Sequence, residues 1–294
     1  ITKFLKENRH LISCKVMAPE TVGIPDNYAN AFTASDVLPH FDVFAGHQYG
    51  GIQTAHKNLQ GLGKEVWMTE YLINWNQNGV SRNFTWGTDA FDFAIKVNEA
   101  MLANINAWVH YASKRYYALM GDGTFGTPLS AISKRGYILA HFARYVTGCT
   151  RTQSTWSDNS GVLQGSSYLS ATGDSVVVMV INNSPNRYSL AVDLPFLTQQ
   201  ARLITTTETV DMATSDTIFA TNTNRPRVNI APSSVSTLIF PKSGSITPSQ
   251  MVGQLVQYAP IDAITPTSPA FGNQYQLSGK TVTFKVDAPL FSNY

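Results

Sequence analysis

The chain carries little charge. Only 14% of its 294 residues are Asp, Glu, Lys or Arg, and 21 basic against 19 acidic residues leave a formal net charge of +2. Nucleic-acid-binding proteins normally cluster basic residues on one face, and this sequence contains no run of Lys or Arg. We therefore predict that nucleic acid is not a partner.

Long apolar runs, cysteine and metal-binding patterns are also scarce. The longest apolar stretch, at residues 175–181, is far too short to span a bilayer, so no membrane segment is predicted. The only two cysteines, Cys14 and Cys149, favour two buried thiols over a disulfide. The histidines lack ligand spacing and no HExxH motif occurs, so neither a metal nor another cofactor is expected.

Aromatic residues, by contrast, are plentiful, with 13 Tyr, 15 Phe and 5 Trp. Together with the low charge, they indicate an extracellular protein with aromatic-lined grooves, so we predict a secreted or cell-surface location. The chain has no initiating Met and no visible signal peptide at Ile1. We therefore expect it to begin inside a larger protein.

One apolar run ends abruptly in a carboxylate. Residues 66–68 (Val, Trp, Met) have the pattern of a buried parallel strand, and Glu70 lies where such a strand would leave the core. In a barrel of alternating strands and helices, the carboxyl ends of the strands carry the chemistry. The position predicts Glu70, between Trp67 and Tyr71, as the nucleophile of a sugar site. The alternative is a glutamate that caps the following segment or pairs with a lysine.

The first half of the chain alternates strands and helices. Strands are predicted at residues 13–18, 41–45, 66–69 and 105–111, and helices at 1–11, 28–38, 53–62, 89–103 and 132–146. Four such units occupy residues 1–149, whereas a complete eight-unit barrel needs about 250 residues. The pattern predicts half of a (β/α)8 barrel, whose two open strand edges should aggregate or find a partner.

From residue 150 the apolar period changes to two, which is typical of antiparallel strands. Strands are predicted at residues 162–169, 175–181, 188–194, 201–207 and 234–240. We expect a small antiparallel β-sandwich at residues 150–241. Residues 242–294 have the composition of a linker, with a strand pattern at 281–286 that could begin a further β module. The predicted fold class is therefore α/β followed by β.

Four segments, in their order and spacing, resemble glycoside hydrolase family 30 over about residues 1–242. They are residues 46–51 (GHQYGG), 67–70 (WMTE), 106–111 (NAWVHY) and 132–137 (ISKRGY). The resemblance implies the C-terminal half of the family's (β/α)8 barrel, strands five to eight, followed by its side β-sandwich. It also implies an endo-β-1,4-xylanase acting on plant cell-wall xylan. The expected partners are xylan or another β-linked polysaccharide, and the upstream half of the same barrel.

Retaining hydrolysis requires two carboxyl groups about 5–5.5 Å apart, one nucleophile and one acid/base. The resemblance implies that Glu70 is the nucleophile. The family's acid/base glutamate ends the fourth strand, which would lie upstream of Ile1, so residues 1–294 alone are expected to be inactive. Glu20, at the end of the fifth strand, is expected to bind sugar hydroxyls or to support the nucleophile, rather than to act as acid/base.

Further substrate-binding residues are expected at the strand ends and in the loops that follow them. His47 and Tyr49 could hydrogen-bond Glu70 or a sugar hydroxyl, and a role in the core is the alternative for His47. Aromatic faces suit the apolar C–H face of a sugar ring. Tyr71 and Tyr111 are therefore expected to bind substrate. The loop residues Trp75 and Trp86 are further candidates for a sugar platform, and an exposed-loop or packing role is the alternative for both.

The loop after the eighth strand bears on the substrate. The glucuronoxylan-specific branch of the family binds the glucuronate side group with an Arg and a Tyr two residues apart, and Arg115 and Tyr117 match those positions. A guanidinium can bind a carboxylate through two hydrogen bonds. His110 and Tyr111 stand where that branch has Trp residues, and Ala118 where it has Gly, which puts glucuronate dependence in doubt.

Two other functions remain open from the sequence. Within the same class of enzyme, the alternative is a β-1,6-glucanase or a glucosylceramidase-like activity. From another class, the alternative is a non-catalytic carbohydrate-binding β-sandwich protein whose barrel portion serves as a scaffold. The strand-end position of Glu70 favours the enzyme.

Overall fold

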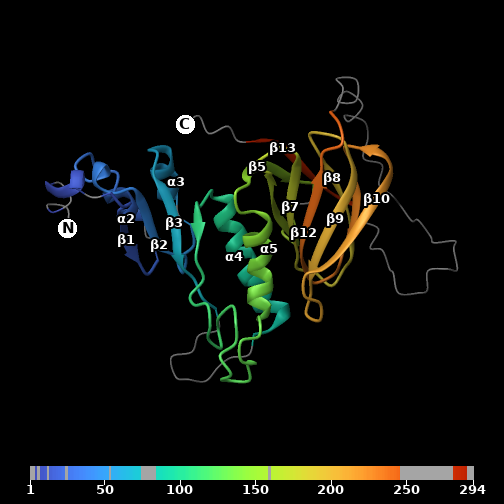
Figure 1. The fold of residues 1–294 in the computed structure, drawn as a ribbon, viewed down its shortest axis with the longest axis horizontal. Coiled ribbons are helices and arrows are strands. Elements are labelled where there is room, and N and C mark those ends of the chain that lie inside the picture. The colour runs from blue at the N-terminus through green and yellow to red at the C-terminus, as the bar shows by residue number, and fades with distance from the viewer. Residues whose placement is uncertain are drawn as a thin grey trace. The chain divides into compact units, whose positions relative to one another are not determined.

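A computed structural model describes residues 4, 7–11, 13–23, 26–52, 54–73, 84–157, 160–245 and 281–289. The described chain divides into two compact units (Figure 1). The parallel unit comprises residues 1–84 and 96–136, and the β unit comprises residues 85–95 and 137–292. No helix within the described ranges combines the length and the apolar character that crossing a bilayer requires.

The parallel unit is built on a four-stranded sheet in the order β1-β2-β3-β4. Its strands, all parallel, are β1 (Met17–Thr21), β2 (Val43–His47), β3 (Glu65–Glu70) and β4 (Ala107–Trp108). The first four residues of β2 are all buried, as expected of a parallel strand that is covered on both faces. The four strands therefore follow one another across the sheet in chain order, as predicted.

Of the strand predicted at residues 105–111, only Ala107–Trp108 is assigned as β4. The backbone pairing with β3 nevertheless continues beyond Trp108. Beyond β4, the backbone N–H of Val109 donates to Met68 and that of Tyr111 donates to Tyr71. These bonds carry the backbone of residues 109–111 alongside the end of β3. Tyr111 is thereby placed beside the residue that follows Glu70.

Most helices before the β strands of the second unit are shorter than predicted. They are η1 (Arg9–Leu11), α2 (Asp26–Ala31), η2 (Leu38–His40), α3 (Thr54–Gly61), η3 (Trp86–Ala90, a π-helix), α4 (Phe91–Leu102) and α5 (Lys134–Tyr145). The exception is the helix predicted at residues 89–103, because η3 runs directly into α4. The helix predicted at residues 28–38 is wrong as one element. The Thr33 hydroxyl donates to the carbonyl of Asn30, a local bond that competes with helix formation, and Pro39 lies in the first turn of the separate helix η2. Part of the helix predicted at residues 1–11 lies outside the described residues.

The β unit contains one nine-stranded sheet in the order β10-β9-β12-β7-β6-β5-β13-β8-β11. Its strands are β5 (Thr150–Trp156), β6 (Leu163–Leu169), β7 (Ser175–Asn182), β8 (Tyr188–Asp193), β9 (Thr198–Thr206), β10 (Ala213–Thr223), β11 (Arg227–Ile230), β12 (Ser234–Pro241) and β13 (Thr281–Pro289). One cluster of buried apolar side chains includes Phe240 of β12 and Leu190 of β8. Strands from distant positions in the sheet thus share a single core.

Four features of the β unit differ from the sequence-based expectation. β5, β10 and β11 had not been predicted: the residues of β5 and β10 do not alternate clearly between apolar and polar, and β11 alternates but has only four residues. β13 pairs with β5 and with β8, so the strand predicted at residues 281–286 belongs to this sheet and does not begin a separate module. That pairing joins segments over 80 residues apart in sequence, which no local pattern can reveal.

Both cysteines lie in the described part of the chain and neither is in a disulfide. Cys149 is half-buried, and burial raises the pKa of its thiol. The expectation of burial is wrong for Cys14, which is exposed. Cys14 precedes β1 at an edge of the parallel sheet, where the described chain provides no strand to cover it.

Candidate active site

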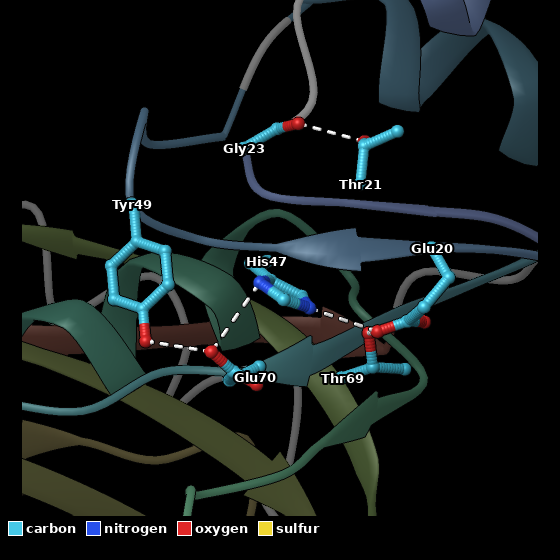
Figure 2. A network of polar contacts seen from close by, with 7 residues as sticks. All are labelled: Glu20, Thr21, Gly23, His47, Tyr49, Thr69 and Glu70. Carbon is cyan, nitrogen blue, oxygen red and sulfur yellow. Dashed lines mark hydrogen bonds and ion pairs between the residues drawn. The ribbon is translucent and has the colours of Figure 1, made fainter.

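Three neighbouring strands of the parallel unit place polar side chains at their carboxyl ends (Figure 2). Glu20 lies near the end of β1, His47 ends β2 and Glu70 ends β3. The pairing of β2 with β3 sets His47 directly opposite Glu70. Because all strands run in the same direction, their carboxyl ends meet, which is where barrel enzymes hold their catalytic groups.

Glu70 has two polar neighbours, one at the end of β2 and one in the loop that follows it. Its Oε1 accepts a hydrogen bond of 3.1 Å from the Tyr49 hydroxyl and lies 3.5 Å from His47 Nδ1. The side chain is 29% exposed, so the carboxylate remains reachable from solvent. Within the described residues it contacts a tyrosine and a histidine rather than a lysine, which disfavours the simple ion-pair alternative.

The hydroxyl of Tyr49 is a dependable donor to Glu70. Burial, and then its hydrogen bond to the Glu70 carboxylate, raise the pKa of Tyr49 well above its ordinary value. The phenol therefore keeps its proton at every pH at which such an enzyme would operate. A neutral donor at this position holds one carboxylate oxygen in place.

Glu20 is also engaged by the neighbouring strands. The Thr69 hydroxyl lies 2.8 Å from each of its two carboxylate oxygens, and His47 Nε2 lies 2.9 Å from its Oε1. Glu20 also has a positive φ of 63°, a conformation that is uncommon for residues other than glycine. His47 thus lies between two glutamates, as Figure 2 shows.

A row of aromatic rings continues from this cluster across the sheet edge. The Tyr49 and Tyr71 ring centroids are 5.7 Å apart, and those of Tyr71 and Trp108 are 5.9 Å apart. The Trp108 indole N–H donates to the side-chain oxygen of Gln48, which is itself buried. Tyr71 is buried as well, so it packs between its neighbours and does not present a face as a sugar platform.

The other candidates for a sugar platform differ in how far their rings are exposed to solvent. Tyr111 is 48% exposed and stacks on Tyr117, with ring centroids 6.3 Å apart and planes at 18°. Trp86 is buried in the β unit and donates its indole N–H to the Ser233 carbonyl, so it has a packing role there. Trp75 lies outside the described residues. Tyr111 is therefore the candidate whose ring remains accessible.

Arg115 and Tyr117, the two residues expected to bind glucuronate, interact with each other. The guanidinium of Arg115 lies against the hydroxyl of Tyr117, and this interaction raises the pKa of Arg115, with a smaller contribution from the charge of Asp122. Arg115 is exposed, whereas Tyr117 is buried.

His110 lies at the position where the resemblance implies a Trp. It is buried, its Nδ1 lies 3.2 Å from the Ala112 carbonyl, and its ring packs 6.3 Å from that of Trp108. Burial, together with the charge of Arg135, lowers the pKa of His110 to about 4. The imidazole is therefore neutral near pH 7 and serves as a packing group in this row of rings.

Thr69 and Gln48 were missed by the sequence analysis. Strict alternation would point Thr69 away from the face used by Glu70, but the register between β2 and β3 shifts between Gly46 and His47. The local shift lets Thr69 reach Glu20. Among the described residues, no group of three or more His, Cys, Asp or Glu is arranged to hold a metal ion.

A parallel sheet whose strand ends gather two glutamates, a histidine and tyrosines is the kind of site found in barrel-type glycoside hydrolases. Two Bacillus subtilis proteins named glucuronoxylanase XynC, one of them from strain 168, are 33% and 30% identical to this chain over 196 and 195 residues. Each alignment covers 63% of this chain and 43% of the relative. The chain thus spans less than half the length of these relatives. No family model matches the chain.

Solved structures show the same fold. A glycoside hydrolase family 30 endoxylanase from Clostridium papyrosolvens C71 is 22% identical, with a TM-score of 0.67, over 82% of this chain and 59% of that one. A family 30 subfamily 8 xylanase from Clostridium acetobutylicum is 20% identical, with a TM-score of 0.66, over 82% and 58% of the two chains. The sequence similarity to the two Bacillus subtilis proteins, together with this shared fold, bears out the predicted resemblance to the family 30 xylanases.

Proposed function

We propose that this chain is part of a retaining β-glycoside hydrolase, an endo-β-1,4-xylanase acting on plant cell-wall xylan, with Glu70 as its nucleophile. The observation that carries the proposal is the setting of Glu70 at the carboxyl end of β3, where the Tyr49 hydroxyl donates to its Oε1 and His47 Nδ1 lies 3.5 Å from the same oxygen. The substrate class follows from the relationship to xylanases. A secreted or cell-surface location fits a polymeric substrate of this kind.

In this mechanism Glu70 attacks the anomeric carbon of the sugar and displaces the leaving group, forming a covalent glycosyl-enzyme that water then hydrolyses. Tyr49 donates to Oε1, which leaves Oε2 as the attacking oxygen. The acid/base must present an oxygen to the glycosidic bond. Glu20 is a poor candidate, because Thr69 and His47 already engage its carboxylate.

We further propose that an upstream segment supplies the acid/base glutamate and the remaining barrel strands. β1 and β4 are the edges of the parallel sheet, and Met17 and Val22 near β1 are 46% and 80% exposed. An open parallel sheet with exposed apolar side chains is expected to acquire further strands. We refer to this chain together with that segment as the complete enzyme.

Expression with and without the upstream segment tests this part of the proposal. Residues 1–294 alone should be poorly soluble and inactive on xylan, and adding the upstream segment, fused or as a separate chain, should restore solubility and activity. Sedimentation and a reducing-sugar assay provide the two measurements. A soluble, active monomer of residues 1–294 would contradict the proposal.

Substitution of Glu70 in the complete enzyme tests the nucleophile. Glu70→Gln should lower turnover of xylan by several orders of magnitude, because the covalent step is lost. The matched control is Glu65→Gln on the same strand, whose side chain bonds Lys15 and Trp67 away from the site and whose loss should leave turnover nearly unchanged. Near-normal activity of a folded Glu70→Gln variant would contradict the assignment of Glu70 as the nucleophile.

The finer proposal is a preference for xylan that carries glucuronate groups. Arg115 is exposed beside Tyr117, and a guanidinium binds a carboxylate with good geometry. The curated relatives are named glucuronoxylanases. The proposal therefore assigns Arg115 and Tyr117 to the glucuronate carboxylate, and Tyr111, which stacks on Tyr117, to an adjoining sugar ring.

A further inference from the structure

A single imidazole lies between both glutamates of the site. His47 Nε2 is 2.9 Å from Glu20 Oε1, and His47 Nδ1 is 3.5 Å from Glu70 Oε1. The His47 side chain is only 11% exposed, so its ring cannot turn freely. The two carboxylates come from different strands, β1 and β3, and the imidazole of β2 connects them (Figure 2).

The chemistry of these groups decides which ring nitrogen of His47 carries a proton. An ionised carboxylate can only accept a hydrogen bond, so at 2.9 Å from Glu20 the Nε2 atom must be the donor. This bond fixes both the tautomer and the orientation of the ring. Nδ1 then faces Glu70, is buried, and has no hydrogen-bond partner in the described structure.

Glu20 is itself held firmly in an unfavourable backbone geometry. Its carboxylate is engaged by the Thr69 hydroxyl, and its positive φ is a conformation that non-glycine residues adopt only where the surrounding structure requires it. Such residues cluster at functional sites. The constraint sets the direction of the Glu20 carboxylate, and the carboxylate sets the direction of the imidazole.

We propose that Glu20 is a positioning residue that acts through His47: it fixes the imidazole beside Glu70, so that the ring limits the positions open to the nucleophile carboxylate while the Tyr49 hydroxyl donates to it. This inference rests on the proposed nucleophilic role of Glu70. It selects one of the two roles open to Glu20, since a residue that supports the nucleophile need not touch the sugar. Alignment matters because small misplacements of a catalytic group cost rate rather than binding.

A double-mutant cycle in the complete enzyme tests the proposal. The variants are Glu20→Ala, His47→Ala and the double substitution, and the readout is the labelling of Glu70 by a fluorinated xylobiosyl fluoride, followed by intact mass. In this reaction an oxygen of Glu70 forms a bond to the anomeric carbon as fluoride ion departs. Because the departing fluoride needs no proton, the rate of Glu70 labelling does not depend on the acid/base residue.

Glu20→Ala should slow labelling by about 10-fold to 100-fold, with little change in the reagent concentration that gives half the maximal rate. In the His47→Ala background the same substitution should cost less than about threefold, because residues that act as a unit are not additive. Fully additive losses would show that Glu20 acts on the sugar directly and would overturn the proposal. Unchanged labelling in Glu20→Ala would also overturn it.

Glu20→Gln provides a conservative rescue, because its amide oxygen can still accept from His47 Nε2. We expect labelling within about threefold of wild type, and heteronuclear NMR should show the proton on Nε2 in both proteins. A loss in Glu20→Gln as large as that in Glu20→Ala would contradict orientation by hydrogen bonding. If Glu20→Ala does not fold, as judged by circular dichroism, the glutamine variant alone decides the question.

The matched control is Glu65→Ala, a carboxylate on β3 bonded to Lys15 outside the site, which should label at the wild-type rate. The two proposals fail differently in this experiment. If wild-type enzyme is labelled at a residue other than Glu70, the nucleophile assignment fails. If Glu70 is labelled equally fast in Glu20→Ala, only the positioning role fails.

Discussion

The parallel unit and the β unit each contain a histidine with little exposure to solvent, and the two differ in whether both ring nitrogens are hydrogen-bonded. In the β unit, His141 is fully buried, and its two ring nitrogens each lie 2.8 Å from a hydroxyl, that of Thr237 or that of Thr206. In the parallel unit, His47 has one nitrogen on Glu20 and leaves the other unsatisfied near Glu70. Buried polar groups are normally satisfied, and the Nδ1 atom of His47 is an exception that lies beside the proposed nucleophile.

The same contrast extends to the surroundings of each histidine. The β unit has a continuous apolar core that includes Val178, Leu190 and Phe240. The parallel unit instead places strained Glu20 and exposed aromatic rings at the carboxyl ends of its strands. Departures from ideal packing tend to collect at functional sites while the rest of a protein supplies the stability. Four predictions test this division, beginning with the largest expected effect.

Phe240→Ala should destabilise the β unit by about 3–5 kcal/mol, because a fully buried aromatic side chain leaves a cavity. The measurement is denaturant unfolding of the complete enzyme followed by circular dichroism. The control is Ile218→Ala on β10, whose side chain is 68% exposed, and we expect a change within about 0.5 kcal/mol. Similar losses at the two positions would show that this core does not carry the stability of the unit.

Acidification should weaken the β unit through His141. Burial lowers the pKa of His141 from 6.5 to about 4, so the unfolded chain takes up a proton at a higher pH than the folded one. Stability is therefore full above pH 6.5 and falls as the pH drops toward about 4, by up to about 3 kcal/mol. In His141→Gln this part of the pH dependence of the unfolding free energy should vanish. An unchanged profile would refute the assignment.

Arg115→Ala should lower kcat/KM on glucuronoxylan by about one to two decades, since a charge-assisted contact contributes roughly 1.5–3 kcal/mol. Activity on undecorated xylo-oligosaccharides should stay nearly unchanged. Arg202→Ala is the matched control, because this exposed arginine of the β unit pairs with Asp216 at 2.9 Å. Equal losses on both substrates in Arg115→Ala would indicate a structural role for Arg115.

Glu20→Gly should be more stable than Glu20→Ala by about 1 kcal/mol, because glycine adopts a positive φ without the steric penalty that a Cβ brings. Thermal unfolding of the two variants makes the comparison. At Glu70, which ends an ordinary strand, the order should reverse and the alanine variant should be the more stable. Glycine and alanine variants of equal stability at position 20 would argue against strain there.

Some of the site was accessible from the sequence. Glu70, His47 and Tyr49 were expected to lie together because each follows an apolar strand and parallel strands end at one edge, and the structure brings them into contact. Their catalytic roles stay predictions. The proposed roles of Tyr71 and Trp86 as platforms do not agree with their burial, because composition identifies an aromatic ring but not the direction it faces.

Local periodicity by itself determined where most strands and helices lie, since apolar runs and alternation depend only on neighbouring residues. Motif order determined the relationship to family 30. Only the tertiary structure decided that β13 completes the sheet of the β unit and that Thr69, Glu20 and His47 form one network. Both depend on strand pairing and on a shift of register between β2 and β3. These are contacts between segments distant in sequence, and no local pattern encodes them.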